Sequence, residues 1–259
     1  MSEPVSSAQY FPWDGGAVFV GTAGVFPVHA HQAIQICFLF EGRIRLRARD
    51  DEPWADYDLG LVPSQHAHGM DGARTHYGAT LFVEPETREG RILTERYLRA
   101  GITNVDRAPV ASIVRELQAA VLEQRGRPAI VALARRIVQC LTQHSEPSVT
   151  SDERILRAVK YVNEHLAAPL TLKQVASVAH LSPSRFRHLF VAQTGVSFRA
   201  YVLWARVGAA VGAAMNGQSW TAAAQEAGFT DSAHLSRTCR RMFGIAPATL
   251  VEEQIPSAR

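Results

Sequence analysis

The sequence predicts an α+β protein of two domains, a β-rich amino-terminal domain that ends in two helices and an all-helical carboxy-terminal domain. Three observations predict this fold class. The 259 residues are 47% hydrophobic and 20% charged, enough for two globular cores. Short β-rich runs give way to helical periodicity near Val110. The last part of the chain contains an internal repeat of helical segments.

The amino-terminal domain is expected to span residues 1–143. Runs of β-forming residues are separated by Gly, Pro and Asp, as in a small barrel or sandwich, and they cover Ala17–Val20, Ile34–Phe40, Arg43–Ala48, Gly60–Val62 and Gly78–Val83. Two amphipathic helices are expected at about 110–142. They either pack on their own barrel, covering an open edge, or form a dimer face.

A polar, aperiodic stretch at residues 144–151 is interpreted as the linker to a second domain at 152–250. The second domain is basic: residues 173–241 contain eight Lys and Arg against two Asp and Glu. This balance favours a polyanionic partner. The sequence has no long apolar run, and its start lacks the pattern of a secretory signal, so a cytoplasmic protein with no membrane partner is expected. The cysteines Cys37, Cys140 and Cys239 have no CxxC spacing, which disfavours a disulfide framework or a zinc-thiolate site.

The repeat predicts two helix-turn-helix motifs, at about 171–194 and 219–243, joined by one long helix at about 198–215. In each copy a small residue is followed four positions later by a turn residue, His180 or Gly228, and then by an apolar plug, Leu181 or Phe229. Ser182 and Thr230 are the predicted N-caps of the second helices. The copies are offset by 48 residues and then by 49, with the extra residue placed after Ala233.

The second copy reads Gly228-Phe-Thr-Asp-Ser-Ala-His-Leu-Ser-Arg237, followed by Arg240-Arg-Met-Phe-Gly-Ile-Ala-Pro247. These motifs, with Leu181-Ser-Pro-Ser184 and Arg206, resemble the AraC/XylS family of bacterial transcription regulators over about residues 152–250. The resemblance implies two recognition helices that read successive major grooves, roughly 34 Å apart. Its implied DNA-binding residues are Ser184, Arg185, Arg187, His188, Ser232, His234, Ser236, Arg237 and Arg240.

Within this set Arg185 and Arg240, with Arg241, are assigned to phosphates, and the others to base edges. The chain departs from the family at Cys239, at Ala233 and at Leu250-Val251. Since Ala233 can contact only a thymine methyl, base reading by the second copy is expected to depend on Arg237. Arg206 is expected to join the two subdomains.

The family's front domain is often a cupin-like β-barrel, and His29, His31 and His68 partly match the cupin metal pattern. Gln35 stands in place of the usual Glu and is a candidate fourth ligand. The three imidazoles suit a divalent transition metal. The alternative is that they line an effector pocket or make core hydrogen bonds. Aromatic side chains for such a pocket are Trp13, Phe38, Trp54 and Phe82.

The function predicted is a sequence-specific DNA-binding transcription regulator that responds to a small-molecule effector, and not an enzyme. Its expected partners are double-stranded promoter DNA, the effector, a second copy of the chain and, by family resemblance, RNA polymerase. Three alternatives stay open: a constitutive regulator whose front domain only dimerises, a metal-dependent cupin enzyme fused to a DNA-binding domain, and a sensor of the metal itself.

Overall fold

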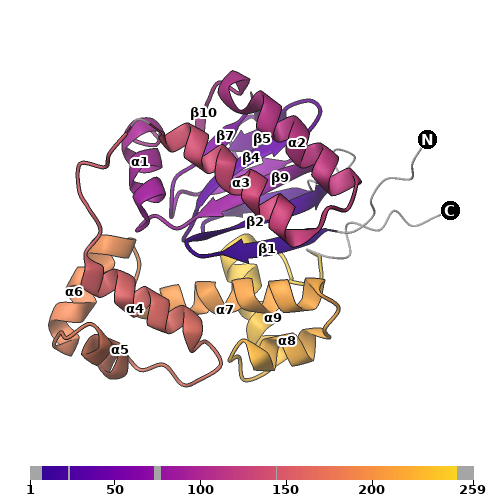
Figure 1. Cartoon of the computed structure of the whole chain (residues 1–259). Helices are drawn as coiled ribbons and strands as arrows, with labels where there is room; N and C mark the ends of the chain where they lie inside the picture. Colours follow the sequence, from indigo (N-terminus) through magenta and orange to yellow (C-terminus); the bar gives the residue numbers. More distant parts are fainter. Residues whose placement is uncertain (1–7, 23, 73–76, 144, 250–259) are drawn as a thin grey trace.

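The computed structural model describes residues 8–22, 24–72, 77–143 and 145–249. The front domain contains two antiparallel sheets (Figure 1). The first has the strand order β1-β2-β9-β4-β7-β10, with the bounds Gln9–Trp13, Gly16–Thr22, Tyr77–Val83, Ile34–Leu39, Gly60–Val62 and Thr103–Asn104. The second has the order β3-β8-β5-β6, with the bounds Val25–His29, His68–Asp71, Ile44–Arg47 and Ala55–Tyr57.

The expected closed barrel is not found among the described residues, because the strands pair within each sheet and the two sheets are not joined edge to edge. The chain instead passes from β4 in one sheet to β5 in the other. A shared core of Cys37, Leu39, Ile44, Leu46, Val62 and Met70 then packs the sheets together. The β-rich character of this domain is confirmed. Strands β1, β3, β6, β8 and β10 were not predicted, since a proline interrupts each of β1 and β3 and the other three are only two to four residues long.

Three helices and one short 3-10 turn complete the front domain: α1 at Arg88–Tyr97, η1 at Ala108–Val110, α2 at Ala111–Leu122 and α3 at Gly126–Thr142. Helix α1 was not predicted. The apolar stripes of α2 and α3 lie in one buried cluster with residues of the six-stranded sheet, including Val18, Ile36 and Leu81. The two predicted helices therefore pack on the six-stranded sheet of their own domain, and the dimer face stays a prediction.

The carboxy-terminal domain consists of six helices: α4 at Glu153–Glu164, α5 at Leu172–Val178, α6 at Pro183–Thr194, α7 at Phe198–Met215, α8 at Trp220–Glu226 and α9 at Ser232–Phe243. Helix α7 lies between two helix groups (Figure 1). Phe198, Tyr201 and Val202 of its first half belong to a core with α4, α5 and α6. Val207, Ala210 and Val211 of its second half belong to a separate core with α8 and α9. One helix thus fixes the relative position of two small cores.

The stretch between α3 and α4 is held against α1. Ser148 Oγ donates to Glu95 at 2.6 Å, Arg88 contacts Glu146 at 2.9 Å, and Arg91 Nε donates to Ser151 Oγ at 2.7 Å. This aperiodic segment is therefore attached along its length. None of the described helices is long and apolar enough to cross a membrane.

Candidate nucleic-acid interface and interdomain sites

Each repeat folds as two helices separated by a left-handed turn. His180 and Gly228 have φ angles of 53° and 83°, which end α5 and α8. Glycine adopts this conformation at little cost, and a Cβ at Gly228 would also lie 2.3 Å from the Leu166 carbonyl oxygen. The next residue in each copy donates its backbone N–H back to the small alanine, Leu181 to Ala176 and Phe229 to Ala224, both at 2.9 Å.

The structure corrects the alignment of the two copies. Ser182 caps α6 by accepting from the Arg185 backbone N–H, and the matching cap of α9 is Asp231, which accepts from His234 N at 2.6 Å. The extra residue of the second copy is therefore Thr230, before the helix, and not a residue after Ala233. Thr230 is not the N-cap as predicted, because its place in the turn precedes the cap by one position.

With the corrected alignment, Ala233 takes the place of Ser184, Arg237 that of His188, and Cys239 that of Phe190. Cys239 is fully buried, and burial raises the pKa of its thiol to about 12. Arg240 and Arg241 next to it in sequence therefore do not produce a reactive thiolate.

The predicted DNA-binding side chains differ in exposure between the copies. In α6, Ser184, Arg185, Arg187 and His188 are all exposed. In α9, Arg237 and Arg240 are exposed, whereas Ser232, His234 and Ser236 are half-buried. The His234 ring packs edge-on against Phe229 at 5.1 Å between centroids, and its Nδ1 lies 3.3 Å from Thr230 Oγ1. The first copy thus presents more free donors than the second.

A basic cleft lies between the start of α7 and the middle of α9. Its lining includes Arg199, His234, Arg237 and Arg241, and no acidic residue of the described part of the chain lines it. Sequence reasoning missed Arg199, because it considered only the two repeats and treated α7 as a spacer. The sequence feature that could have identified Arg199 is its position, two residues after Ser197, the N-cap of α7.

Arg206 has the role that the family resemblance implies. Its guanidinium donates to the carbonyl oxygens of Leu166 and Ala168, at 3.0 and 2.9 Å, in the loop after α4. The same guanidinium lies beside Gly228 in the turn of the second motif. It therefore joins the two helix groups at α7.

The front domain contacts both helix-turn-helix motifs. Gln32 Nε2 donates to the Thr194 carbonyl at the end of α6 at 2.8 Å, and Arg91 donates to Gln193 at 2.7 Å. At the end of α9, the Phe243 ring packs 5.8 Å from both His31 and Trp204. A Cβ on the adjacent Gly244 would lie 2.4 Å from Pro27 Cγ. The position of each recognition helix is thus tied to the front domain.

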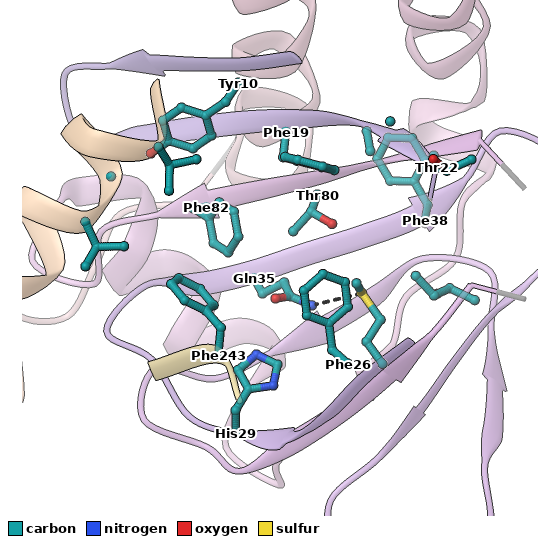
Figure 2. Close-up of a pocket in the computed structure, with 18 of the residues that line it drawn as sticks. Tyr10, Phe19, Thr22, Phe26, His29, Gln35, Phe38, Thr80, Phe82 and Phe243 are labelled. Atoms are coloured by element: carbon teal, nitrogen blue, oxygen red, sulfur yellow. Dashed lines mark hydrogen bonds between the residues drawn. The ribbon is translucent and has the colours of Figure 1, made fainter. Parts of the chain in front are cut away.

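A small apolar pocket lies between the two sheets and is closed by the DNA-binding domain (Figure 2). Its volume is about 80 Å³. The sheets supply Phe19, Phe26, Phe38 and Phe82, while Trp204, Val207 and Phe243 come from α7 and α9. Of the predicted aromatic set, Phe38 and Phe82 line this pocket and Trp13 does not. Trp54 lies elsewhere, under the Arg47 guanidinium at 4.4 Å.

His29, His31 and His68 converge at the edge of this pocket. Strands β3 and β8 pair His29 with His68, and the candidate ligand atoms of the three rings all lie within 4.8 Å of one another. Gln35 Oε1 lies 3.1 Å from His31 Nε2 and 3.3 Å from His68 Nε2. The residues that the sequence singled out are therefore brought together.

The hydrogen bonds of the rings show that this donor set fits a metal ion. Each Nδ1 lies 2.8–3.0 Å from a backbone carbonyl oxygen, of Pro27, Ala33 or His66. A carbonyl oxygen only accepts, so each Nδ1 carries the hydrogen and each neutral ring keeps a lone pair on Nε2. Such backbone bonds are how metal-binding histidines are commonly oriented. Burial lowers the pKa of His31 to about 4 and lowers those of His29 and His68, which keeps the rings neutral.

One metal-free arrangement competes with this one. A half-turn of the Gln35 amide would point its N–H₂ group at His31 and His68 and satisfy both rings. Gln35 Nε2 now faces Met70 Sδ at 3.7 Å, a weak acceptor (Figure 2). Of the other histidines near this site in the sequence, His66 lies outside the cluster of candidate ligands, and His76 lies outside the described residues.

The fold and the exposed basic helices define a two-domain protein with a double helix-turn-helix DNA-binding domain. Residues 175–253 match the helix-turn-helix domain family. Regulatory protein PocR of Salmonella typhimurium is 29% identical over 113 residues, which cover 40% of this chain and 37% of PocR. Probable transcriptional regulator LumQ of Photobacterium leiognathi is 32% identical over 88 residues, 34% of this chain and 36% of LumQ. The chain thus matches well under half the length of these relatives.

The whole fold is similar to that of ToxT from Vibrio cholerae, with a TM-score of 0.60 at 9% identity, over 94% of this chain and 100% of ToxT. A ToxT structure with bound unsaturated fatty acid gives a TM-score of 0.57 at 12% identity, over 100% of this chain and 99% of that one. The carboxy-terminal domain therefore contains a helix-turn-helix domain, and the front domain is sheet-rich within a fold similar to that of ToxT.

Proposed function

We propose that the protein is a transcription regulator that binds promoter DNA through α6 and α9 and responds to an effector held against its front domain. The observation that supports this most is the pair of capped helices whose exposed faces carry Arg187, His188 and Arg237. The two cores on α7 fix their separation, which suits two half-sites in successive major grooves. The curated relatives are regulators, so an enzymatic role has no support among them.

Arg237→Ala tests this function. We expect the variant to lose about 1–3 kcal/mol of binding free energy on its operator and less on scrambled DNA, because a base-reading arginine carries sequence information. Operators can be selected from random DNA, and affinity measured by fluorescence anisotropy at several salt concentrations. Arg135→Ala, an exposed arginine on α3, is the matched control. Equal losses on operator and scrambled DNA would contradict base reading by Arg237.

The basic cleft extends the proposed interface. Arg199 and Arg241, with Arg185 and Arg240, are assigned to phosphates, which position the protein without reading sequence. Arg199→Ala should weaken operator and scrambled DNA alike and flatten the dependence of log affinity on log salt by about one unit. An unchanged salt slope would remove Arg199 from the interface.

The effector is assigned to the apolar pocket of Figure 2, whose lining includes Trp204 and Phe243 of the DNA-binding domain as well as residues of both sheets. A ligand there would touch both domains and so shift their arrangement. Dimerisation stays a prediction from the two helices at about 110–142, and contact with RNA polymerase stays a prediction from the family resemblance.

A metal-responsive regulator is the second candidate function, favoured by three histidine ligand atoms within 4.8 Å of one another and by an amide oxygen 3.1 and 3.3 Å from two of the rings. His29, His31 and His68, with Gln35, would hold a divalent transition metal, whose charge would link β3 and β8 to the wall of the effector pocket.

Native mass spectrometry of untagged protein purified without chelator tests the metal. We expect one ion per chain, lost in His68→Ala and kept in the control His66→Ala. A metal-free chain after incubation with Zn²⁺, Co²⁺, Ni²⁺ or Mn²⁺ would mean that the Gln35 amide is turned to satisfy the rings and that the metal function is wrong.

A further inference from the structure

We infer that a second cleft between the two domains binds an organic cation, with the Glu84 carboxylate as its anchor and aromatic rings as its walls. The cleft has a volume of about 420 Å³, several times that of the apolar pocket. Its inner lining consists of Tyr10, Trp13, Phe82, Glu84, Tyr201 and Trp204. The front domain supplies the first four and α7 supplies the last two.

Glu84 has one satisfied oxygen and one unsatisfied oxygen. Oε1 accepts from Trp204 Nε1 at 2.8 Å, while Oε2 is buried and has no hydrogen-bond partner among the described residues. Asp14 and Arg127 also line the cleft, but both are exposed at its mouth, and Arg127 donates to the Pro12 carbonyl at 2.8 Å. The carboxylate is therefore left without a cationic partner of its own.

The charge of Glu84 needs compensation from a proton or from a ligand. Burial and the nearby Glu86 raise the pKa of Glu84 to about 8. Glu86 is itself buried beside α7, where its Oε1 accepts from the Tyr201 hydroxyl at 2.9 Å. A cation bound in the cleft against the Glu84 carboxylate would replace the proton and form a charge-assisted hydrogen bond with it.

The rings around Glu84 favour an organic cation over a metal ion. The faces of tryptophan and tyrosine rings attract ammonium and amidinium groups, and they also pack on the apolar part of such a ligand. The lining contains two carboxylates, Glu84 and the exposed Asp14, and among the described residues no group of three His, Cys, Asp or Glu side chains comes together there. The chemical class is therefore an amine or amidine attached to a flat apolar group.

This site is separate from the apolar pocket but shares a wall with it. Phe82 and Trp204 line both, and their rings meet edge-on with centroids 5.9 Å apart. Since Trp204 belongs to the helix that connects the two helix-turn-helix cores, a ligand on Glu84 would act on that helix directly. The inference does not depend on DNA binding, which the tests of Arg237 address separately.

Isothermal titration calorimetry of the full chain with benzamidine and benzylamine tests the site. The neutral counterparts benzamide and benzyl alcohol have nearly the same shapes. We expect saturable binding of a cation, and affinity lower by about tenfold or more for its neutral counterpart and in Glu84→Gln. Glu89→Gln removes the same charge from the surface of α1, outside the cleft, and should bind like the wild type.

Proton release gives a second readout in the wild type alone. Cation affinity should rise between pH 6 and 8, and the heat of binding should vary with the ionisation enthalpy of the buffer, because Glu84 must lose its proton. The inference is overturned if neither cation binds saturably, if the neutral counterparts bind equally well, or if Glu84→Gln binds like the wild type.

Discussion

At the scale of single residues, burial decides which chemistry is available. Cys37 and Cys239 are buried thiols whose pKa values burial raises to about 12, so neither is poised for redox chemistry. Glu84 and Glu86 are the opposite case, since they are acidic groups retained at a domain interface. Trp204 and Tyr201 donate to one oxygen of each, and the second oxygen of each is unsatisfied among the described residues.

The raised pKa of Glu84 predicts a pH dependence of stability. The folded protein holds this proton up to about pH 8, whereas a carboxyl in the unfolded chain loses it near 4.5. Stability should therefore fall as pH rises through this range, by at most about 1.4 kcal/mol per pH unit for one proton, and level off above the folded pKa. Urea unfolding between pH 6.5 and 8.5 measures the slope.

Glu84→Gln should flatten that slope and stabilise the protein at pH 8. The buried His29, His31 and His68 have lowered pKa values in the folded protein, so they add a slope of opposite sign that fades as pH rises above 6.5. Since both proteins contain these histidines, the difference between the two slopes reports Glu84. Identical slopes in the wild type and in Glu84→Gln would show that Glu84 is ionised in the folded protein at neutral pH.

At the scale of elements, helix ends explain the correction to the repeat. Asp231 caps α9, and the cap lowers the pKa of Asp231 because the His234 backbone N–H stabilises the charged form. Asp231→Ala should destabilise the protein by about 1 kcal/mol, whereas Thr230→Ala should have a much smaller effect. Thermal unfolding of both variants distinguishes the two assignments, and a larger loss for Thr230→Ala would restore the original one.

The residues that directly follow the two recognition helices can be compared as a pair. Gly195 and Gly244 both end their helices in the left-handed region, with φ of 79° and 73°. A Cβ at Gly195 meets nothing within 4 Å, but one at Gly244 would meet Pro27. Gly195→Ala should cost only the backbone strain, about 1–2 kcal/mol. Gly244→Ala should cost more and also separate α9 from β3.

Hydrogen exchange of the β3 amides measures this separation. Faster exchange in Gly244→Ala than in Gly195→Ala is the expected result. Equal exchange in the two variants would mean that the packing of α9 on β3 adds no protection to the front domain.

At the scale of the whole molecule, the two domains are held together at several points along the DNA-binding domain. Gln32 of the front domain binds the end of α6, and the Phe243 ring at the end of α9 packs against the front domain. Trp204 and Tyr201, on the helix between them, donate hydrogen bonds to the front domain. Both ligand sites that we propose lie in this interface. An effector that changes the fit of α7 against the sheets would therefore change how the two recognition helices are presented to DNA.

Loosening the interface should change DNA affinity without touching a DNA-facing side chain. Gln32→Ala removes the bond to Thr194, and Arg91→Ala removes the bonds to Gln193 and Ser151. We expect the double variant to stay folded, to show a larger radius of gyration in X-ray scattering, and to differ from the wild type in operator affinity. Unchanged scattering and affinity would show that these contacts do not set the domain arrangement.

The sequence by itself determined the local features of this protein. Periodicity and capping residues predicted the helix at 198–215 with its observed bounds, and the repeat predicted both helix-turn-helix motifs. These signals involve residues that are close together in the sequence, so they can be recognised without the tertiary structure. The partial match of His29, His31 and His68 to the cupin metal pattern also led to the expectation that they converge, and β3 and β8 do pair His29 with His68.

Only the tertiary structure decided the rest. Whether the strands close into a barrel depends on pairing between distant edges, which no run of residues records. The place of the inserted residue depends on which side chain accepts from the His234 backbone N–H in the first turn of α9. The partnership of Glu84 with Trp204, 120 positions apart, arises from packing between domains, where burial and the nearby Glu86 turn an ordinary glutamate into a candidate ligand-binding group.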